Sequence, residues 1–307
     1  MRRLFLTGGN GMVGRNLREA PGIEEWHVLA PSRSQLDLLD AQAVRDWLER
    51  HRPDAVVHAA GVVGGIQANL DAPWRFLDEN ARIGLNVIGA CRDMRVPVLI
   101  NLSSSCVYPA DLGRDLSEEQ ILTGRLEPSN EGYALAKIMA MRLVELARRQ
   151  DPGLQWCSLV PCNLYGPHDH FAPERSHLLA AIIHKLHRAR VDNSNRVEIW
   201  GDGEARREFM YAPDLAQAIL RALRDPGRLP EVMNIGPGVD HTINDYYCLA
   251  AEIIGWEGHF IHDPDRPVGM RQKLLSIRRQ QDWGWMPATP LDRGIAATYE
   301  HYLEHHA

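Results

Sequence analysis

The fold is decided at the start of the chain, by the stretch Leu4-Phe5-Leu6-Thr7-Gly8-Gly9-Asn10-Gly11-Met12-Val13-Gly14. An apolar run enters a Gly-x-x-Gly-x-x-Gly turn directly, and an amphipathic segment follows. Glycines let a backbone approach a pyrophosphate closely, and the N-terminus of the next helix offers unpaired N–H donors and the positive end of its dipole. Because it lies between an expected strand and helix, the turn predicts dinucleotide binding; the alternative is a glycine-rich turn needed only for packing.

Short apolar runs alternate with longer amphipathic segments, which is typical of parallel strands joined by helical crossovers. We therefore expect a Rossmann-type doubly wound α/β fold with a smaller interleaved α/β lobe. The expected strands are residues 4–7, 27–30, 55–59, 98–102 and 156–160, and the expected helices are 12–19, 41–49, 74–94 and 133–149. A strand at 232–235 could return to the sheet, and Asp214 is a plausible N-cap within the strand-and-helix segment 207–223. The dinucleotide-binding domain is predicted at 1–165 with about 208–238, and the substrate lobe at about 166–207 and 239–307.

Composition and charge limit the function classes. The 307 residues are 45% hydrophobic and 24% charged, which suits a globular protein of roughly two units of about 150 residues each. Its 34 basic and 40 acidic side chains give a net charge of −6, so no excess of cations attracts nucleic acid. Five cysteines without a Cys-x-x-Cys pair favour a reducing compartment. The first apolar run is too short for an export signal, and no run is long enough to span a membrane. We expect a cytoplasmic protein with no nucleic-acid or membrane partner.

The residues after the second expected strand help to identify the nicotinamide cofactor. An acidic residue there would bond the ribose hydroxyls of NAD, whereas a cation accepts the additional phosphate of NADP. The chain reads Pro31-Ser32-Arg33-Ser34, which favours NADP(H) unless Arg33 is only a solvated surface charge. Asp40 could contact the adenine amino group, or it could cap the helix that follows.

A Tyr-x-x-x-Lys pair lies in the helix expected at 133–149. Tyr133 and Lys137 are one helical turn apart, so the phenol and the ammonium share a helix face. The nearby cation is expected to lower the Tyr133 pKa from its reference of about 10, which makes the phenol a usable proton donor or acceptor. With Ser104 after the strand at 98–102, this pair predicts a site where Ser104 bonds the oxygen that Tyr133 protonates. The alternative is a packed tyrosine beside a lysine that extends to the surface.

Further motifs carry a resemblance to a known family. They are Val63-Gly64-Gly65-Ile66, Ser104-Ser105-Cys106-Val107-Tyr108-Pro109, Glu127-Pro128-Ser129-Asn130-Glu131, Asn163-Leu164-Tyr165-Gly166-Pro167-His168-Asp169, Ser176-His177, Trp200-Gly201 and Arg207-Glu208-Phe209. Over nearly its whole length the chain resembles the GDP-L-fucose synthase family of the extended short-chain dehydrogenase/reductases, which are GDP-4-keto-6-deoxymannose 3,5-epimerase/4-reductases. The resemblance implies an NADPH-dependent, multifunctional enzyme of nucleotide-sugar metabolism. It would epimerise a GDP-linked 4-keto-6-deoxy sugar and then deliver a hydride to carbon 4.

The resemblance gives Cys106 and His177 catalytic roles beside Ser104, Tyr133 and Lys137. Dehydratases of the superfamily carry Thr-Asp-Glu where this chain has Ser104-Ser105-Cys106, so their carboxylates are absent. A 4-keto group makes the hydrogens on carbons 3 and 5 acidic, and Cys106 and His177 look like the base and acid on opposite ring faces. Ser104 and Tyr133 would hold the enolate oxygen. The alternatives are a small buried thiol and a histidine that hydrogen-bonds at a helix N-terminus.

The resemblance also implies the binding residues. Lys137 would support both Tyr133 and the nicotinamide ribose. The positions implied for the cofactor are Gly8, Asn10, Gly11, Met12, Val13, Gly14, Arg33, Asp40, Ala59, Leu102, Ser103, Lys137, Pro161, Asn163, Leu164 and His177. Those implied for the substrate are Ser105, Asn163, Lys185, Trp200, Arg207 and Lys273. Lys185, Trp200 and Arg207 would lie at the nucleotide end, where two cations suit a diphosphate.

Two positions depart from the family pattern. Asn10 stands where an Arg commonly precedes the second glycine of the turn, which leaves Arg33 as the main candidate for the 2′-phosphate of NADP. Residues 267–273 read Pro-Val-Gly-Met-Arg-Gln-Lys and lack the carboxylate of the family's Pro-Asp-Gly. The substrate of a C4-reductase or epimerase could therefore differ, for example a 6-deoxy-heptose or a deoxygenated hexose. A non-catalytic dinucleotide-binding regulator is a third alternative, which the intact Tyr133 and Lys137 pair opposes.

Histidines and apolar helix faces raise two further questions. No carboxylate-bearing zinc motif accompanies the histidines at 168, 170, 177, 184 and 187, so we expect no metal, and those at 301, 305 and 306 are expected to form a solvated tail. The helices expected at 74–94 and 133–149 carry apolar side chains on more than one face. This pattern predicts a homodimer in which these helices pair with their copies.

Overall fold

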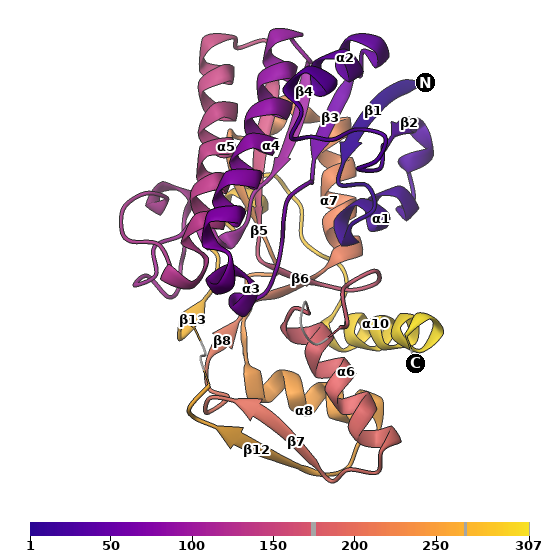
Figure 1. Ribbon diagram of the computed structural model, residues 1–307, viewed down its shortest axis with the longest axis vertical. Coiled ribbons are helices and arrows are strands. Elements are labelled where there is room, and N and C mark those ends of the chain that lie inside the picture. The colour runs from indigo at the N-terminus through magenta and orange to yellow at the C-terminus, as the bar shows by residue number, and fades with distance from the viewer. Residues whose placement is uncertain (173–175, 267–268, 307) are drawn as a thin grey trace.

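A six-stranded parallel sheet with helices on both faces forms the larger part of the molecule, a computed structural model that describes residues 1–172, 176–266 and 269–306 (Figure 1). The strand order is β10-β5-β4-β3-β1-β2, and every neighbouring pair is parallel. The strands are β1 (Arg2–Thr7), β2 (Trp26–Leu29), β3 (Ala55–His58), β4 (Val98–Leu102), β5 (Gln155–Pro161) and β10 (Val232–Ile235). All six lie within two residues of their predicted positions, and β10 returns to the sheet beside β5. The doubly wound α/β fold is confirmed.

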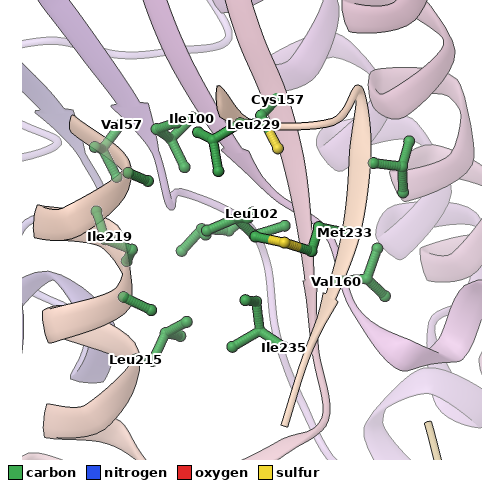
Figure 2. Close-up of a cluster of buried hydrophobic side chains, with 14 of the residues drawn as sticks. Val57, Ile100, Leu102, Cys157, Val160, Leu215, Ile219, Leu229, Met233 and Ile235 are labelled. Carbon is green, nitrogen blue, oxygen red and sulfur yellow. The ribbon is translucent and has the colours of Figure 1, made fainter. Parts of the chain in front are cut away.

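Each face of the sheet is covered by its own set of helices. On one face α1 (Met12–Glu19) packs beside α7 (Ala212–Arg224), and on the other lie α2 (Ala41–His51), α4 (Pro73–Asp93) and α5 (Glu131–Gln150). Successive strand side chains point to opposite faces, so Val57 and Ile100 belong to the first apolar cluster while Val56 and Leu99 belong to the second. Figure 2 shows the first cluster, where strand side chains face Leu215 and Ile219 of α7. Parallel strands buried on both faces explain the continuous apolar runs in the sequence.

The glycine turn joins β1 to α1 as the sequence predicts. Gly8 has a φ of +74°, and a Cβ there would lie 2.8 Å from backbone atoms of Ala59 and Ala60. A Cβ on Gly14 would lie 2.3 Å from the carbonyl oxygen of Gly8. The N–H of Gly11 donates to that same oxygen at 3.0 Å, and α1 begins at the next residue. The turn therefore requires glycine at positions 8 and 14, where backbone segments come into direct contact.

The smaller interleaved lobe lies at the opposite end of the molecule (lower half of Figure 1). Its helices are α6 (Leu178–Val191), α8 (Ile243–Ile254) and α10 (Leu291–His305), which share one apolar cluster with β7 (Arg196–Trp200) and β12 (His259–Asp263). Two small sheets connect it to the main sheet: β11 (His241–Thr242), β8 (Arg206–Arg207) and β13 (Gln272–Lys273), and the pair β6 (Asn163–Tyr165) and β9 (Phe209–Tyr211). The short helices are α3 (Ile66–Asp71) and α9 (Arg278–Asp282). Within the described ranges, no helix combines the length and the apolar character needed to cross a bilayer.

Two local predictions are wrong. Asp214 does not cap α7, because that helix begins after Tyr211 and Asp214 lies in its first turn. Its carboxylate instead accepts hydrogen bonds from the backbone N–H and the hydroxyl of Thr289, at 3.1 and 3.0 Å. The C-terminal histidines are not simply a solvated tail, since His301 belongs to α10 and its Nε2 accepts the backbone N–H of His168 at 3.2 Å. Both errors concern contacts between segments far apart in sequence.

Candidate active site

The carboxyl ends of the parallel strands carry the predicted cofactor residues. Gly8 follows β1, Ala59 follows β3, Ser103 follows β4 and Pro161 ends β5. Because these strands run in one direction, the four positions lie at one edge of the sheet, where α/β proteins bind ligands. Met12 and Val13 form the first turn of α1, whose N-terminus has no side-chain cap. Its backbone N–H groups are therefore free of a capping side chain and suit a pyrophosphate.

The residues after β2 offer a second part of a cofactor site. Arg33 is exposed and forms no hydrogen bond or ion pair with the described part of the chain. An uncommitted guanidinium three residues after Ala30, which packs against Gly9 of the turn, fits the 2′-phosphate of NADP. Of the two roles left open for Asp40, the structure shows the helix cap. Its Oδ1 caps α2 by accepting the N–H groups of Gln42 and Ala43 at 2.9 and 3.0 Å. Arg33 and the glycine turn fit NADP(H) as the bound group, whereas Asp40 has a structural partner.

Ser104 and Cys106 lie directly beyond β4. Ser104 is the N-cap of a short 3₁₀ turn, and its Oγ accepts the N–H of Cys106 at 3.4 Å. Cys106 is only 5% exposed, and this burial raises the pKa of its thiol. A hydrogen bond with the Ser104 side chain and the charges of Lys273 and Lys137 act in the opposite direction. The thiol is therefore a buried group within electrostatic reach of two ammonium groups.

Tyr133 and Lys137 lie near the start of α5. The Nζ of Lys137 donates to the carbonyl oxygen of Leu102 at 2.9 Å and lies 5.6 Å from the centroid of the Tyr133 ring. Burial lowers the pKa of Lys137 to about 8. Burial also raises the pKa of Tyr133, and the charge of Cys106 acts in the same direction. The predicted lowering of the Tyr133 pKa is wrong, because the ammonium lies over the ring face and desolvation outweighs its attraction. The phenol keeps its proton at neutral pH.

Arg207 and Lys273 form a pair of cations on adjacent strands. β8 and β13 run parallel, with Arg207 and Lys273 as direct register partners. Burial lowers the pKa of both groups, and the charge of Glu127 acts against this effect in each case. Lys273 also interacts with Cys106, so the cation pair lies beside the thiol. Of the predicted substrate segment 267–273, Pro267 and Val268 lie outside the described residues.

Lys185 and Trp200 come together in the smaller lobe. The Nζ of Lys185 lies 5.6 Å from the centroid of the Trp200 ring, and the guanidinium of Arg266 lies 5.2 Å from it. The indole N–H of Trp200 donates to the Glu198 carboxylate at 3.0 Å. Trp200 is 45% exposed, so the indole and the two cations over its ring form a surface that a ligand can reach, whereas the indole N–H already has a partner. The sequence did not identify Arg266.

Three other predicted residues have environments that limit their roles. His177 immediately precedes α6, and burial lowers the pKa of its imidazole, but no contact among the described residues links it to Cys106. The hydroxyl of Ser103 donates to the sulfur of Met141 at 2.9 Å in the core and its backbone N–H donates to the carbonyl oxygen of Leu159 at 2.8 Å, so its carbonyl oxygen is the group left for a cofactor. The side-chain amide of Asn163 donates to the carbonyl oxygen of Glu208 at 3.0 Å. Ser105 is buried, while Asn10 and Gly11 are exposed.

Three of the five histidines considered as metal ligands have other side-chain partners. His184 and His187 hydrogen-bond through Nδ1 to the tyrosine hydroxyls of Tyr302 and Tyr299, each at 3.0 Å. His168 pairs with the carboxylate of Glu19 at 2.8 Å. Within the described ranges, the group close enough to hold a metal is a different one at the end of α10, which consists of His301, Glu304 and His305. It lies outside the candidate site.

Comparisons with known proteins find similar chains over the full length. Residues 4–236 match the profile of the NAD dependent epimerase/dehydratase family. A GDP-L-fucose synthase of Azorhizobium caulinodans is 48% identical, over 98% of this chain and 96% of that protein. A GDP-L-colitose synthase of Yersinia pseudotuberculosis is 43% identical, over 98% of each. A solved structure described as MlghC, GDP-mannoheptose C4 reductase from Campylobacter jejuni with NADP bound, matches with a TM-score of 0.89 and 26% identity over 98% of each chain.

Proposed function

The chain belongs to the NAD dependent epimerase/dehydratase family and, within it, to the GDP-L-fucose synthase family of extended short-chain dehydrogenase/reductases; from that membership we propose that it is an NADPH-dependent epimerase-reductase of a GDP-linked 4-keto-6-deoxy sugar. The observation that carries the proposal is the convergence of Ser104, Cys106, Tyr133 and Lys137 beyond β4, beside a glycine turn suited to a dinucleotide. The curated relatives act on GDP-linked sugars by their names, which supports the same substrate class here.

NADPH, when bound, supplies the hydride that reduces carbon 4 of the sugar. Tyr133 donates its proton to the oxygen on that carbon, since burial keeps the phenol protonated at neutral pH. Ser104 bonds the same oxygen and orients it. Lys137 lies against the Tyr133 ring and stabilises the phenolate that remains after the proton has left. Arg33 holds the 2′-phosphate of the adenosine half, and Gly8 and the uncapped start of α1 hold the pyrophosphate.

Cys106 and His177 carry out the epimerisations before reduction. A proton must leave carbon 3 or 5 on one ring face and return on the other, so the site needs a donor and an acceptor. Burial favours the neutral forms of both groups, because it raises the pKa of the Cys106 thiol and lowers that of the His177 imidazole. A neutral thiol and a neutral imidazole offer one proton and one lone pair between them. Ser104 and Tyr133 stabilise the enolate oxygen that forms on the substrate.

The cations of the site suit the diphosphate of the substrate. Arg207 and Lys273 are adjacent on β8 and β13, and Lys185 lies beside the exposed face of Trp200. Asn163 and Ser105 complete the predicted substrate set. We assign the cofactor lobe to residues 1–165 with about 208–238, and the substrate lobe to about 166–207 and 239–307. Most members of the apolar clusters follow this division, which supports it, while Leu275 and Trp283 pack in the main-sheet cluster and Phe209 packs in the cluster of the smaller lobe.

We propose a homodimer that forms through α4 and α5. These two helices pack against each other, and their outer side chains Leu85, Leu135 and Leu146 are 47%, 40% and 53% exposed. Burial of such a face against its copy would remove apolar surface from water. Light scattering at micromolar concentration tests this assembly, and a monomer at that concentration contradicts it. The five free cysteines support a cytoplasmic location.

A related sugar is the second candidate substrate. The segment that ends in Lys273 lacks the carboxylate of the family's Pro-Asp-Gly, and similar proteins include a GDP-L-colitose synthase and a GDP-mannoheptose C4 reductase. Initial rates with GDP-4-keto-6-deoxymannose, its 3-deoxy analogue and the 6-deoxy-heptose counterpart separate the candidates. The proposed function predicts NADPH oxidation that is fastest with GDP-4-keto-6-deoxymannose and slowed at least about 100-fold in Tyr133→Phe. No oxidation with that compound contradicts the leading assignment, and oxidation only with an analogue selects the second candidate.

A further inference from the structure

Glu208 is a buried carboxylate to which the proposed mechanism assigns no step. It lies between β8 and β9 and is 1% exposed. Its two oxygens accept backbone N–H groups from Gly238 and Leu275, at 2.8 and 3.0 Å. No cation in the described part of the chain forms an ion pair with it, and burial raises its pKa to about 7. A buried carboxylate loses hydration, so these two backbone donors must compensate for that loss.

The two hydrogen bonds join segments that are far apart in the sequence. Gly238 follows β10, the edge strand of the main sheet, while Leu275 is two residues beyond Lys273. A Cβ on Gly236 would lie 2.3 Å from Oε1 of Glu208, so the carboxylate packs directly against the backbone there. Glu208 therefore ties the strand that carries Lys273 to the end of the main sheet.

The same residue adjoins two other predicted substrate residues. Arg207 is its chain neighbour, and neighbouring side chains of an extended segment point to opposite sides. Arg207 accordingly interacts with Lys273 and Glu127, whereas Glu208 reaches the opposite way to Gly238. The carbonyl oxygen of Glu208 accepts the side-chain amide of Asn163 at 3.0 Å. Three predicted substrate residues thus share contacts with a single junction.

We propose that Glu208 is a positioning residue of the nucleotide-sugar site, whose carboxylate fixes the strand of Lys273 against that of Arg207 so that both cations are set in place for a diphosphate. Cations that are already in place bind an anion without the entropy loss of ordering a loop. The inference rests on the proposed function, because that function supplies the diphosphate. The inference goes beyond the proposed function because Glu208 never touches the substrate and yet determines the affinity for it.

Glu208→Gln tests the proposal. The amide has one oxygen, which can accept one of the two backbone N–H groups, while its NH₂ group faces the other N–H and cannot accept it. Calorimetry with GDP should show affinity weakened by about tenfold, the upper end of the effect expected for one lost hydrogen bond. The KM of the nucleotide sugar should rise by a similar factor, with NADPH affinity within about twofold of wild type. The matched control is Asp214→Asn, which disrupts a similarly buried carboxylate that holds Thr289 through two hydrogen bonds. This control should leave GDP affinity unchanged.

Equal GDP affinity in wild type and Glu208→Gln overturns the inference. It is also overturned if Glu208→Gln and Asp214→Asn both lose GDP affinity and NADPH affinity to the same extent. If Glu208→Gln does not fold, Gly236→Ala displaces the carboxylate from the other side and should weaken GDP binding selectively. A wild-type protein that binds no GDP also overturns it. A wild-type protein that binds GDP but oxidises no NADPH with any keto sugar refutes the proposed function alone, while the comparison of GDP affinities still decides the role of Glu208.

Discussion

Gly14→Ala is a direct test of the dinucleotide turn, because the new methyl group has no space. A Cβ at this position lies 2.3 Å from the Gly8 carbonyl oxygen, 2.6 Å from Cα of Gly9 and 2.8 Å from its carbonyl carbon. All three neighbours are backbone atoms, so no side chain can rotate away. The turn itself must move by roughly 1 Å to restore ordinary packing distances of about 3.4–4 Å.

The size of the effect follows from two opposing contributions. Alanine is favoured over glycine inside a helix by about 1 kcal/mol. Overpacking of a closed contact costs about 1–3 kcal/mol, and here the strained backbone is also the proposed cofactor cradle. The net cost is up to about 2 kcal/mol, and because the displaced backbone is the proposed cradle we expect it to appear in NADPH binding, as a dissociation constant raised by up to about 30-fold.

The assay is titration of NADPH fluorescence, with unfolding by urea as the check on stability. The control is Gly89→Ala on α4, where a Cβ would meet nothing within 4 Å. Gly89→Ala should stabilise the fold by up to about 1 kcal/mol and leave NADPH affinity unchanged. If Gly14→Ala binds NADPH within about threefold of wild type, the turn does not hold the cofactor.

The remaining predictions concern the catalytic residues. Tyr133→Phe should lower kcat for NADPH oxidation about 100- to 10,000-fold with GDP affinity unchanged, and a normal kcat would exclude Tyr133 as the proton donor. Cys106→Ser should lose deuterium uptake at carbons 3 and 5 from heavy water; wild-type uptake, read by mass spectrometry, counts against the thiol. The rate constant kcat/KM should fall as the pH rises above about 8, because burial makes Lys137 lose its proton at that lower pKa. A pH profile that stays flat to pH 10 would show that the charge of Lys137 is not needed.

Local signals predicted the main sheet accurately. The helix expected at 12–19 is α1 (Met12–Glu19), and the strand expected at 98–102 is β4. In both cases a periodic run of apolar residues stands directly beside a glycine or another turn-forming residue in the sequence. The return of β10 to the sheet was also predicted, since a short apolar run after a helix is typical of a further βαβ strand.

The site was predicted less completely because its features depend on tertiary contacts. The Tyr-x-x-x-Lys spacing predicted that Tyr133 and Lys137 share a helix face. It did not predict the burial of Tyr133, which raises the pKa of the phenol. Glu208 was visible within the Arg-Glu-Phe motif, but its partners lie 30 and 67 residues away. Asp214 looked like a helix cap because no local signal revealed Thr289. Such long-range pairings leave no trace in local periodicity or composition.

We propose that one site both inverts carbons of a keto sugar and reduces it. The most direct measurement is NMR of the product formed from GDP-4-keto-6-deoxymannose and NADPH in heavy water by the wild-type protein. We expect inverted centres at carbons 3 and 5 that carry deuterium, and a protium at carbon 4 delivered by the cofactor. A product reduced at carbon 4 with protium and original configuration at both other carbons would contradict it.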